Sequence, residues 1–223
     1  MRLVVFDCDG TLVDSQHMIV AAMEQAFSGF GLPSPERSAI LSVVGLSLEL
    51  AVSRLVPTAD TLDVTALAEA YKGAFGDLRR DRAHQEPLYP GVRDTLLALA
   101  GQPGTLLGVA TGKSRRGLVA VLDREGLADL FVTLQTADTH PSKPHPAMLM
   151  AAMAEAGVDA SRTLMVGDTT YDITMAREAG TRAIGVGWGY HPVADLEAAG
   201  AHRVLADSLT LASALRSELQ QLG

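Results

Sequence analysis

The pattern of hydrophobic and polar positions divides the chain into two parts. A short apolar run at 3–6 is typical of a strand that is buried on both faces of a parallel sheet. The stretch from about 15 to 82 instead carries apolar residues at three- and four-residue spacing, which predicts helices with no convincing strand between them. These predicted helices cover 18–30, 48–55 and 62–78.

From Tyr89 onward, helical and strand patterns alternate, as in a doubly wound α/β sheet. We predict strands at 3–7, 105–110, 132–136, 163–167, 182–186 and near 203–205. The helices expected between and after them are 92–100, 114–125, 146–156, 171–179 and 208–221. A long helical stretch separates the first strand from the others. We therefore expect an α/β core with a mainly parallel, Rossmann-like sheet (1–14 and 87–223) and an inserted all-helical cap domain (15–86).

Two carboxylates follow the first predicted strand directly. Side chains alternate along a strand, so Asp7 and Asp9 should point to the same side, next to the break at Gly10. Their repulsion is tolerable only where a cation neutralises them or where one of them holds a proton. An ordinary turn is the alternative, because Asp-Gly is a common turn signal. Three later segments at predicted strand ends favour chemistry over a turn: Thr111-Gly112, Lys143, and Asp168 with Asp172.

With these four segments together, the sequence resembles the haloacid dehalogenase superfamily, and specifically its magnesium-dependent phosphatases with a small helical cap. The motifs run from Asp7 to Asp172, and the implied fold covers essentially the whole chain. The segments GDTTYDI and GVGWGYHP further resemble the phosphoglycolate phosphatase subgroup.

The resemblance assigns a role to each carboxylate. Asp7 would be the nucleophile that forms an aspartyl-phosphate, and Asp9 would protonate the leaving alkoxide and later activate water. Asp168 and Asp172 would bind Mg²⁺ together with Asp7 and the backbone carbonyl of Asp9, since a set of oxygen ligands suits this ion. Helix capping is the alternative for Asp168 and Asp172, and one of them can serve both purposes.

Other residues would surround the phosphate. Thr111 and Gly112 lie between a predicted strand and helix, where a hydroxyl and a free amide can bind phosphate oxygens, and Gly10 joins them in the resemblance. Lys143 is the candidate for the fixed positive charge beside Asp7. We assign the remaining nearby polar and sulfur side chains to structure: Lys113, Arg115 and Arg116 to a solvated helix surface, and Cys8 to the core.

The resemblance also predicts a loop that meets the substrate. Gly45 permits a tight turn in the segment 44–48, and Leu46 and Leu48 would present an apolar face to the leaving group. Phosphosugar mutases of the superfamily carry charges where this segment has aliphatic residues. Specificity would then depend on shape.

The sequence therefore predicts a magnesium-dependent phosphatase that hydrolyses a small phosphomonoester, with phosphoglycolate as the leading substrate. A pyrophosphatase, a sugar-phosphate phosphatase or a phosphomutase of the same superfamily is the nearest alternative. A receiver-like signalling module or a non-catalytic phosphate-binding protein is the alternative from another class. The strand at 105–110 ends without an aspartate and the chain carries a large insert, which argues against a receiver.

The charge and composition of the chain favour a small molecule as its binding partner. The net charge of −8 and the pI near 5.2 disfavour nucleic acid and anionic membranes, and the chain has no apolar run long enough to cross a bilayer. Cys8 is the only cysteine and no leader pattern opens the chain, so we expect a cytoplasmic protein. A small phosphorylated metabolite is the expected partner, with the chain acting as a monomer or homodimer.

Overall fold

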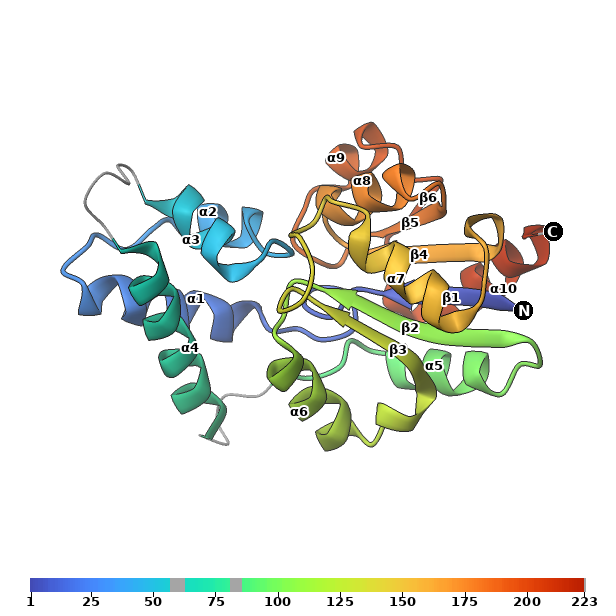
Figure 1. Cartoon of the computed structure of the whole chain (residues 1–223), viewed down its shortest axis with the longest axis horizontal. Helices are drawn as coiled ribbons and strands as arrows, with labels where there is room; N and C mark the ends of the chain where they lie inside the picture. Colours follow the sequence, from blue (N-terminus) through green and yellow to red (C-terminus); the bar gives the residue numbers. More distant parts are fainter. Residues whose placement is uncertain (57–62, 81–85, 223) are drawn as a thin grey trace.

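A computed structural model describes residues 1–56, 63–80 and 86–222, which form two lobes (Figure 1). The larger lobe contains a six-stranded sheet in the order β3-β2-β1-β4-β5-β6, and every neighbouring pair of strands is parallel. The strands are β1 (Arg2–Phe6), β2 (Thr105–Thr111), β3 (Phe131–Thr136), β4 (Thr163–Gly167), β5 (Arg182–Val186) and β6 (Arg203–Leu205). This architecture confirms the predicted doubly wound α/β sheet.

Helices cover both faces of the sheet. Alternate residues of β1 belong to different cores: Val4 and Phe6 pack with one cluster, and Leu3 and Val5 pack with the other. The first cluster includes α5 (Val92–Ala100), α6 (Arg115–Glu125) and α10 (Leu211–Gln221). The second includes α7 (Ala147–Ala156), α8 (Thr170–Glu178) and α9 (Val193–Ala198). Burial on both faces explains why the β1 sequence is apolar without alternation.

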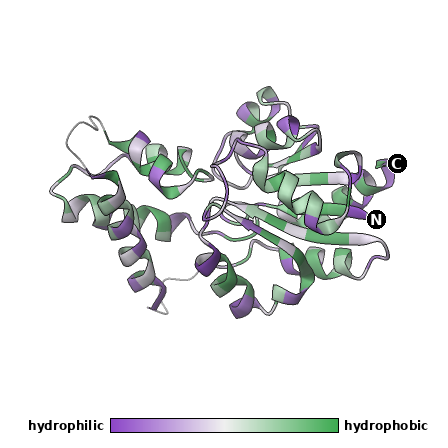
Figure 2. Ribbon diagram, in the orientation of Figure 1, coloured by the Kyte–Doolittle hydropathy of each residue, from purple (hydrophilic) through white to green (hydrophobic). Residues whose placement is uncertain are grey.

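The smaller, helical lobe lies between β1 and α5 in the sequence. It consists of α1 (Gln16–Gly29), α2 (Arg37–Ser42), α3 (Leu48–Leu55) and α4 (Val64–Arg80), which pack around a core of their own that includes Met18, Phe27, Ile40, Val52 and Leu67. Figure 2 shows hydrophobic and hydrophilic residues alternating around these helices, whereas the strands are mostly hydrophobic. The predicted helices agree closely, except that α2 and α9 were not expected and that Leu62, in the third predicted helix, lies outside the described residues.

Two short segments connect the lobes and lie side by side. The amide of Asp14 donates to the carbonyl of Pro87 over 2.8 Å, and the amide of Tyr89 donates to the carbonyl of Leu12 over 3.0 Å. The chain therefore leaves and re-enters the sheet lobe at one place, close to the end of β1. Within the ranges described above, no helix is long and apolar enough to cross a membrane.

Candidate active site

The carboxyl ends of three adjacent strands bring the predicted motifs together. Asp7 follows β1, Thr111 ends β2 and Asp168 follows β4, and these strands are neighbours in the order β2-β1-β4. In an open parallel sheet, this edge beside the point where the strand order reverses is where ligands bind. Asp172, in the first turn of α8, reaches the same place.

Three buried carboxylates form the centre of the site. One oxygen from each of Asp7, Asp168 and Asp172 lies within 4.8 Å of the others, and none of the three side chains is more than 1% exposed. The Oδ2 atom of Asp7 is buried without a hydrogen-bond partner among the described residues. An unpaired, buried carboxylate oxygen beside two further carboxylates fits a hard divalent cation, which binds oxygen ligands.

Asp168 is fixed in place by hydrogen bonds to both oxygens. The Thr11 hydroxyl donates to Oδ1 over 2.8 Å, and the backbone amide of Tyr190 donates to Oδ2 over 3.0 Å. A Cβ atom on Gly10 would lie 2.2 Å from Asp168 Oδ2, and one on Gly189 would lie 2.2 Å from the Asp168 Cβ. The positive φ of Gly10, 83°, also favours glycine there. Gly10 therefore makes room for Asp168, while its role toward phosphate remains a prediction.

Asp172 caps α8 and also faces the cluster. Its Oδ2 accepts hydrogen bonds from the Thr169 amide over 3.1 Å and from the Thr169 hydroxyl over 2.7 Å, in a reciprocal capping box. Its Oδ1 accepts from Lys143 Nζ over 2.6 Å. The capping interpretation of Asp172 is thus confirmed. Its Oδ1 atom is not used in the cap and instead contacts Lys143.

Lys143 supplies a buried positive charge between two carboxylates. Its Nζ atom lies 3.0 Å from Asp7 Oδ1 as well as 2.6 Å from Asp172 Oδ1, and its side chain is fully buried. Burial alone would lower the pKa of Lys143, but the carboxylates of Asp172 and Asp7 outweigh it and raise the pKa above its ordinary value. Lys143 therefore stays protonated and holds Asp7 in position.

A single lysine does not neutralise three carboxylates. Burial raises the pKa of Asp7 to about 6; Lys143 opposes this effect, and the charges of Asp172 and Asp9 add to it. Burial, followed by the charges of Asp7 and Asp172, also raises the pKa of Asp168 well above its usual range. The protein alone thus leaves excess negative charge in this cluster, which a divalent cation would offset.

Asp9 lies beside this cluster in a different environment. Its Oδ1 accepts a hydrogen bond from the Ser15 hydroxyl over 2.6 Å and forms an ion pair with Lys113 Nζ over 2.8 Å. The Ser15 hydroxyl also contacts the Tyr190 hydroxyl over 3.0 Å. The structure therefore separates the two motif aspartates, with Asp7 paired to Lys143 and Asp9 paired to Lys113.

The interpretation of Lys113 as a solvated helix residue is wrong. Its side chain is only 8% exposed, because Nζ lies between Asp9 and the carboxylate of Glu86, which is 2.7 Å away. Arg115 and Arg116, by contrast, are exposed as expected. Glu86 is fully buried and was not among the predicted site residues. Its only signal in the sequence is its position at the end of the predicted insert.

The loop after β2 meets the helical lobe directly. The Thr111 hydroxyl accepts a hydrogen bond from the Lys113 amide over 3.2 Å, and Ser114 caps α6. A Cβ atom on Gly112 would lie 2.5 Å from the Leu46 carbonyl oxygen and 2.7 Å from that of Gly45. The two lobes are therefore in backbone contact at Gly112.

The segment 44–48 forms the expected turn at the contact between the lobes. Gly45 has a φ of 97°, as a tight turn requires. The Leu46 side chain is 4% exposed and packs with Val43 and Ala51 and against Tyr171, while Leu48 packs against the core of the helical lobe. Leu46 is thus buried between its own lobe and Tyr171 of α8, whereas Leu48 is half-buried, and their contact with a leaving group stays a prediction.

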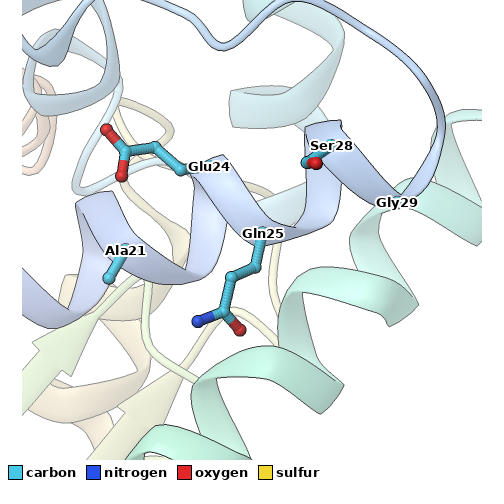
Figure 3. A pocket seen from close by; sticks show the side chains of 5 residues that line it. All are labelled: Ala21, Glu24, Gln25, Ser28 and Gly29. Atoms are coloured by element: carbon cyan, nitrogen blue, oxygen red, sulfur yellow. The ribbon is translucent and has the colours of Figure 1, made fainter.

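A separate depression on the helical lobe lies along α1 (Figure 3). It is lined by Ala21, Glu24, Gln25, Ser28 and Gly29, which lie on one face of that helix. None of the residues of the acidic cluster lines it, and Glu24 is its only ionisable side chain. Its single ionisable group contrasts with the cluster of three carboxylates and Lys143 at the sheet edge, so we place the chemistry there.

Comparisons with known proteins identify a family model and relatives that cover most of the chain. Residues 4–186 match the model of the family described as haloacid dehalogenase-like hydrolase. The chain is 43% identical over 203 residues to the "Probable phosphatase IndB" of Dickeya dadantii, covering 88% of this chain and 86% of the relative. It is 35% identical over 209 residues to a phosphoglycolate phosphatase of Pseudomonas putida, with coverages of 92% and 76%. The crystal structure of a predicted phosphoglycolate phosphatase from Haemophilus somnus superimposes with a TM-score of 0.85 at 24% identity, over 96% of this chain and 98% of the other.

Proposed function

Because the chain belongs to the haloacid dehalogenase-like hydrolase family and is a phosphatase of that family, we propose that it hydrolyses a small phosphomonoester through an aspartyl-phosphate on Asp7, with Mg²⁺ as cofactor. The observation that carries this proposal is the buried cluster of Asp7, Asp168 and Asp172 beside Lys143, with one Asp7 oxygen left unpaired. Such a cluster is costly for stability alone, which argues for a role in chemistry.

Charge repulsion is the first obstacle to the reaction, because both Asp7 and a phosphate ester are anionic. The ion would be held by Asp7, Asp168, Asp172 and the backbone carbonyl of Asp9, and when bound it supplies positive charge for the phosphate oxygens and the carboxylates. Lys143 holds Asp7 from the side, 3.0 Å from Oδ1. The Oδ2 atom of Asp7 has no hydrogen-bond partner among the described residues. The nucleophile is thereby ionised and restrained.

The attack of Asp7 on phosphorus breaks the bond to the leaving-group oxygen, which needs a proton. We assign this proton to Asp9, which lies two residues from Asp7 and outside the acidic cluster. After the leaving group departs, Asp9 would take a proton from the water that attacks the aspartyl-phosphate. Phosphate is then released and Asp7 is free for another cycle.

Phosphate oxygens would be bound at the loop that follows β2. The Thr111 hydroxyl is close to Asp7, and the Gly112 amide precedes the N-terminus of α6, which favours anions. Gly10 and Lys143 complete the proposed set around the phosphate. Residues 15–86 would act as a cap that closes over this site, since their turn at 44–48 touches Gly112.

Phosphoglycolate is our leading substrate, because several of the most similar curated relatives are named phosphoglycolate phosphatases. The proposal places the enzyme in the cytoplasm as a monomer or homodimer. A panel of phosphorylated metabolites, assayed for phosphate release with and without magnesium, tests the function. We expect magnesium-dependent turnover of at least one small ester, with Asp7→Asn as the inactive control. Release of phosphate from none of them, or equal release by Asp7→Asn, would contradict the proposal.

A further inference from the structure

The Asp9 carboxylate is held through one of its two oxygens. Both the Ser15 hydroxyl and Lys113 Nζ contact Oδ1, at 2.6 Å and 2.8 Å. Among residues 1–56, 63–80 and 86–222, no hydrogen-bond partner contacts Oδ2. Two contacts on one oxygen restrict rotation of the carboxylate, and they leave Oδ2 as the oxygen available to a leaving group.

Lys113 is itself held from several directions. Its Nζ atom lies 2.7 Å from Glu86 Oε1 and 5.0 Å from the centre of the Phe75 ring. A Cβ atom on Gly117 would lie 3.2 Å from the Lys113 Cγ, so the stem of the lysine lies against the first turn of α6. These contacts restrict the side-chain conformation of Lys113 and hold its ammonium group beside Asp9.

Glu86 links this lysine to both lobes. Its Oε2 atom accepts from the Nε and one terminal nitrogen of Arg79, at 3.1 Å and 2.9 Å, and Arg79 belongs to α4 of the helical lobe. Arg124, on α6, donates to the Glu86 backbone carbonyl. The ion-pair chain Arg79–Glu86–Lys113–Asp9 therefore runs from a helix of the smaller lobe to the carboxylate beside the nucleophile.

We propose that Lys113 and Glu86 are positioning residues for the leaving-group acid: they hold Asp9 by Oδ1 and thereby direct Oδ2 to the leaving oxygen when α4 is docked. This inference rests on the proposed function, because it needs Asp9 to act as the acid. It makes protonation of the leaving group depend on the position of the helical lobe. A purely structural ion-pair chain would instead affect the turnover of every substrate alike.

Substrates that differ in their need for an acid distinguish these roles. p-Nitrophenol is a good leaving group that departs with little protonation, whereas an alkyl alkoxide must be protonated as it leaves. We would compare p-nitrophenyl phosphate with the best alkyl phosphate of the metabolite panel, in the presence of magnesium. Lys113→Met removes the ammonium and keeps most of the stem, and Lys72→Met, at an exposed lysine on α4, is the matched control.

We expect Lys113→Met to lower kcat for the alkyl phosphate by about 100-fold or more, the usual contribution of general acid catalysis, and kcat for the aryl phosphate by less than about tenfold. Lys113→Arg should restore part of the alkyl activity, and Lys72→Met should change neither substrate. Equal losses on both substrates, or a rise in KM alone, would overturn the positioning role while leaving the phosphatase function in place. A wild-type protein that hydrolyses no alkyl phosphate would overturn the proposed function and this inference with it.

The variant Glu86→Gln also tests the inference. Because glutamine is neutral, this substitution leaves no unpaired charge buried at position 86. The amide can still accept a hydrogen bond from Lys113, so the variant should fold, which circular dichroism and a urea unfolding curve would verify. We expect a loss of about threefold to tenfold in kcat, confined to the alkyl phosphate, because the hold on Lys113 is weakened but not removed. If Lys113→Met does not fold, the ratio of the two activities in Glu86→Gln decides the question.

Discussion

The ammonium group of Lys143 lies 3.0 Å from Oδ1 of Asp7, with both side chains almost completely buried. Two opposite charges that share a site without solvent depend on each other, because either one alone would be a buried charge without compensation. Lys143 also contacts Asp172, so a single side chain links the residues after β1 and at the start of α8. The geometry of the site and the stability of the fold are therefore coupled at Lys143.

Replacement of Lys143 by methionine should destabilise the metal-free protein. The change leaves Asp7 and Asp172 buried with no cation between them, and breaking a buried pair in this way typically costs about 3–5 kcal/mol. Urea unfolding followed by circular dichroism measures this cost. The variant Lys72→Met, which removes an exposed pair, should change the unfolding free energy by less than about 1 kcal/mol. Similar stabilities of the two variants would contradict the role given to Lys143.

The stability of the metal-free protein should fall as the pH rises through the acidic range. The pKa of Asp7 is raised from 3.8 to about 6, so the folded state binds this proton more tightly than the unfolded state does. Between these two values the unfolding free energy should decrease, by an amount on the order of 3 kcal/mol for this group, and should stay lower above about pH 6.

Magnesium should reverse this decrease, and should do so more strongly at neutral pH than at about pH 4, because the cation binds the ionised carboxylates. Urea unfolding curves across this range, with magnesium or with a chelator, provide the measurement. Asp7→Asn is the control, since it removes the contribution of Asp7 and should reduce the pH dependence to the part that comes from Asp168, whose pKa is also raised. Identical curves with and without magnesium at neutral pH would argue against a metal site at Asp7, Asp168 and Asp172.

A methyl group on Gly112 should keep the helical lobe from reaching its observed position. In Gly112→Ala the Cβ would lie 2.5 Å from the Leu46 carbonyl, which is backbone and cannot rotate away. We expect a loss of at least about tenfold in kcat/KM with little change in the unfolding free energy, because the conflict lies between lobes. Gly73→Ala, on α4 with open space around it, is the control and should retain wild-type kcat/KM. Full activity of Gly112→Ala would show that this contact is not needed in turnover.

Local sequence pattern predicted the strands and the site edge well. The ranges 163–167, 182–186 and 203–205 agree with β4, β5 and β6, and Asp7 and Asp168 follow their strands as expected. Such agreement has a physical basis, because a strand buried on both faces must be apolar and the change to acidic residues marks its end. The six-residue helix α2 was missed because so short a helix has little periodicity to detect.

Contacts between distant segments were the part that the sequence did not predict. Lys113 and Glu86 are separated by 27 positions. The residues next to each of them in the sequence show no pattern that would indicate a buried ion pair. The packing of Leu46 with Val43 and Ala51 and against Tyr171 of the other lobe was likewise not predicted. Tertiary packing decides which side of a short turn is buried, and no period along the chain carries that information.

Asp7→Asn should abolish turnover and retain the fold. An amide cannot serve as the nucleophile, so we expect a loss of about 1,000-fold or more in the single-turnover rate with any ester. The metal-free variant should be at least as stable as wild type at neutral pH, because one of three crowded carboxylates is removed. Single-turnover hydrolysis within about tenfold of the wild-type rate would exclude the covalent role of Asp7.

The most direct test of the account is to trap the aspartyl-phosphate. The variant Asp9→Asn keeps the nucleophile but lacks the base that activates water, and p-nitrophenyl phosphate needs little acid to react. After mixing the two with magnesium and quenching in acid, we expect one phosphoryl group per protein, mapped by mass spectrometry to the peptide that contains Asp7. Release of p-nitrophenol with no phosphoryl group on the protein, or with the group on another residue, would contradict the account.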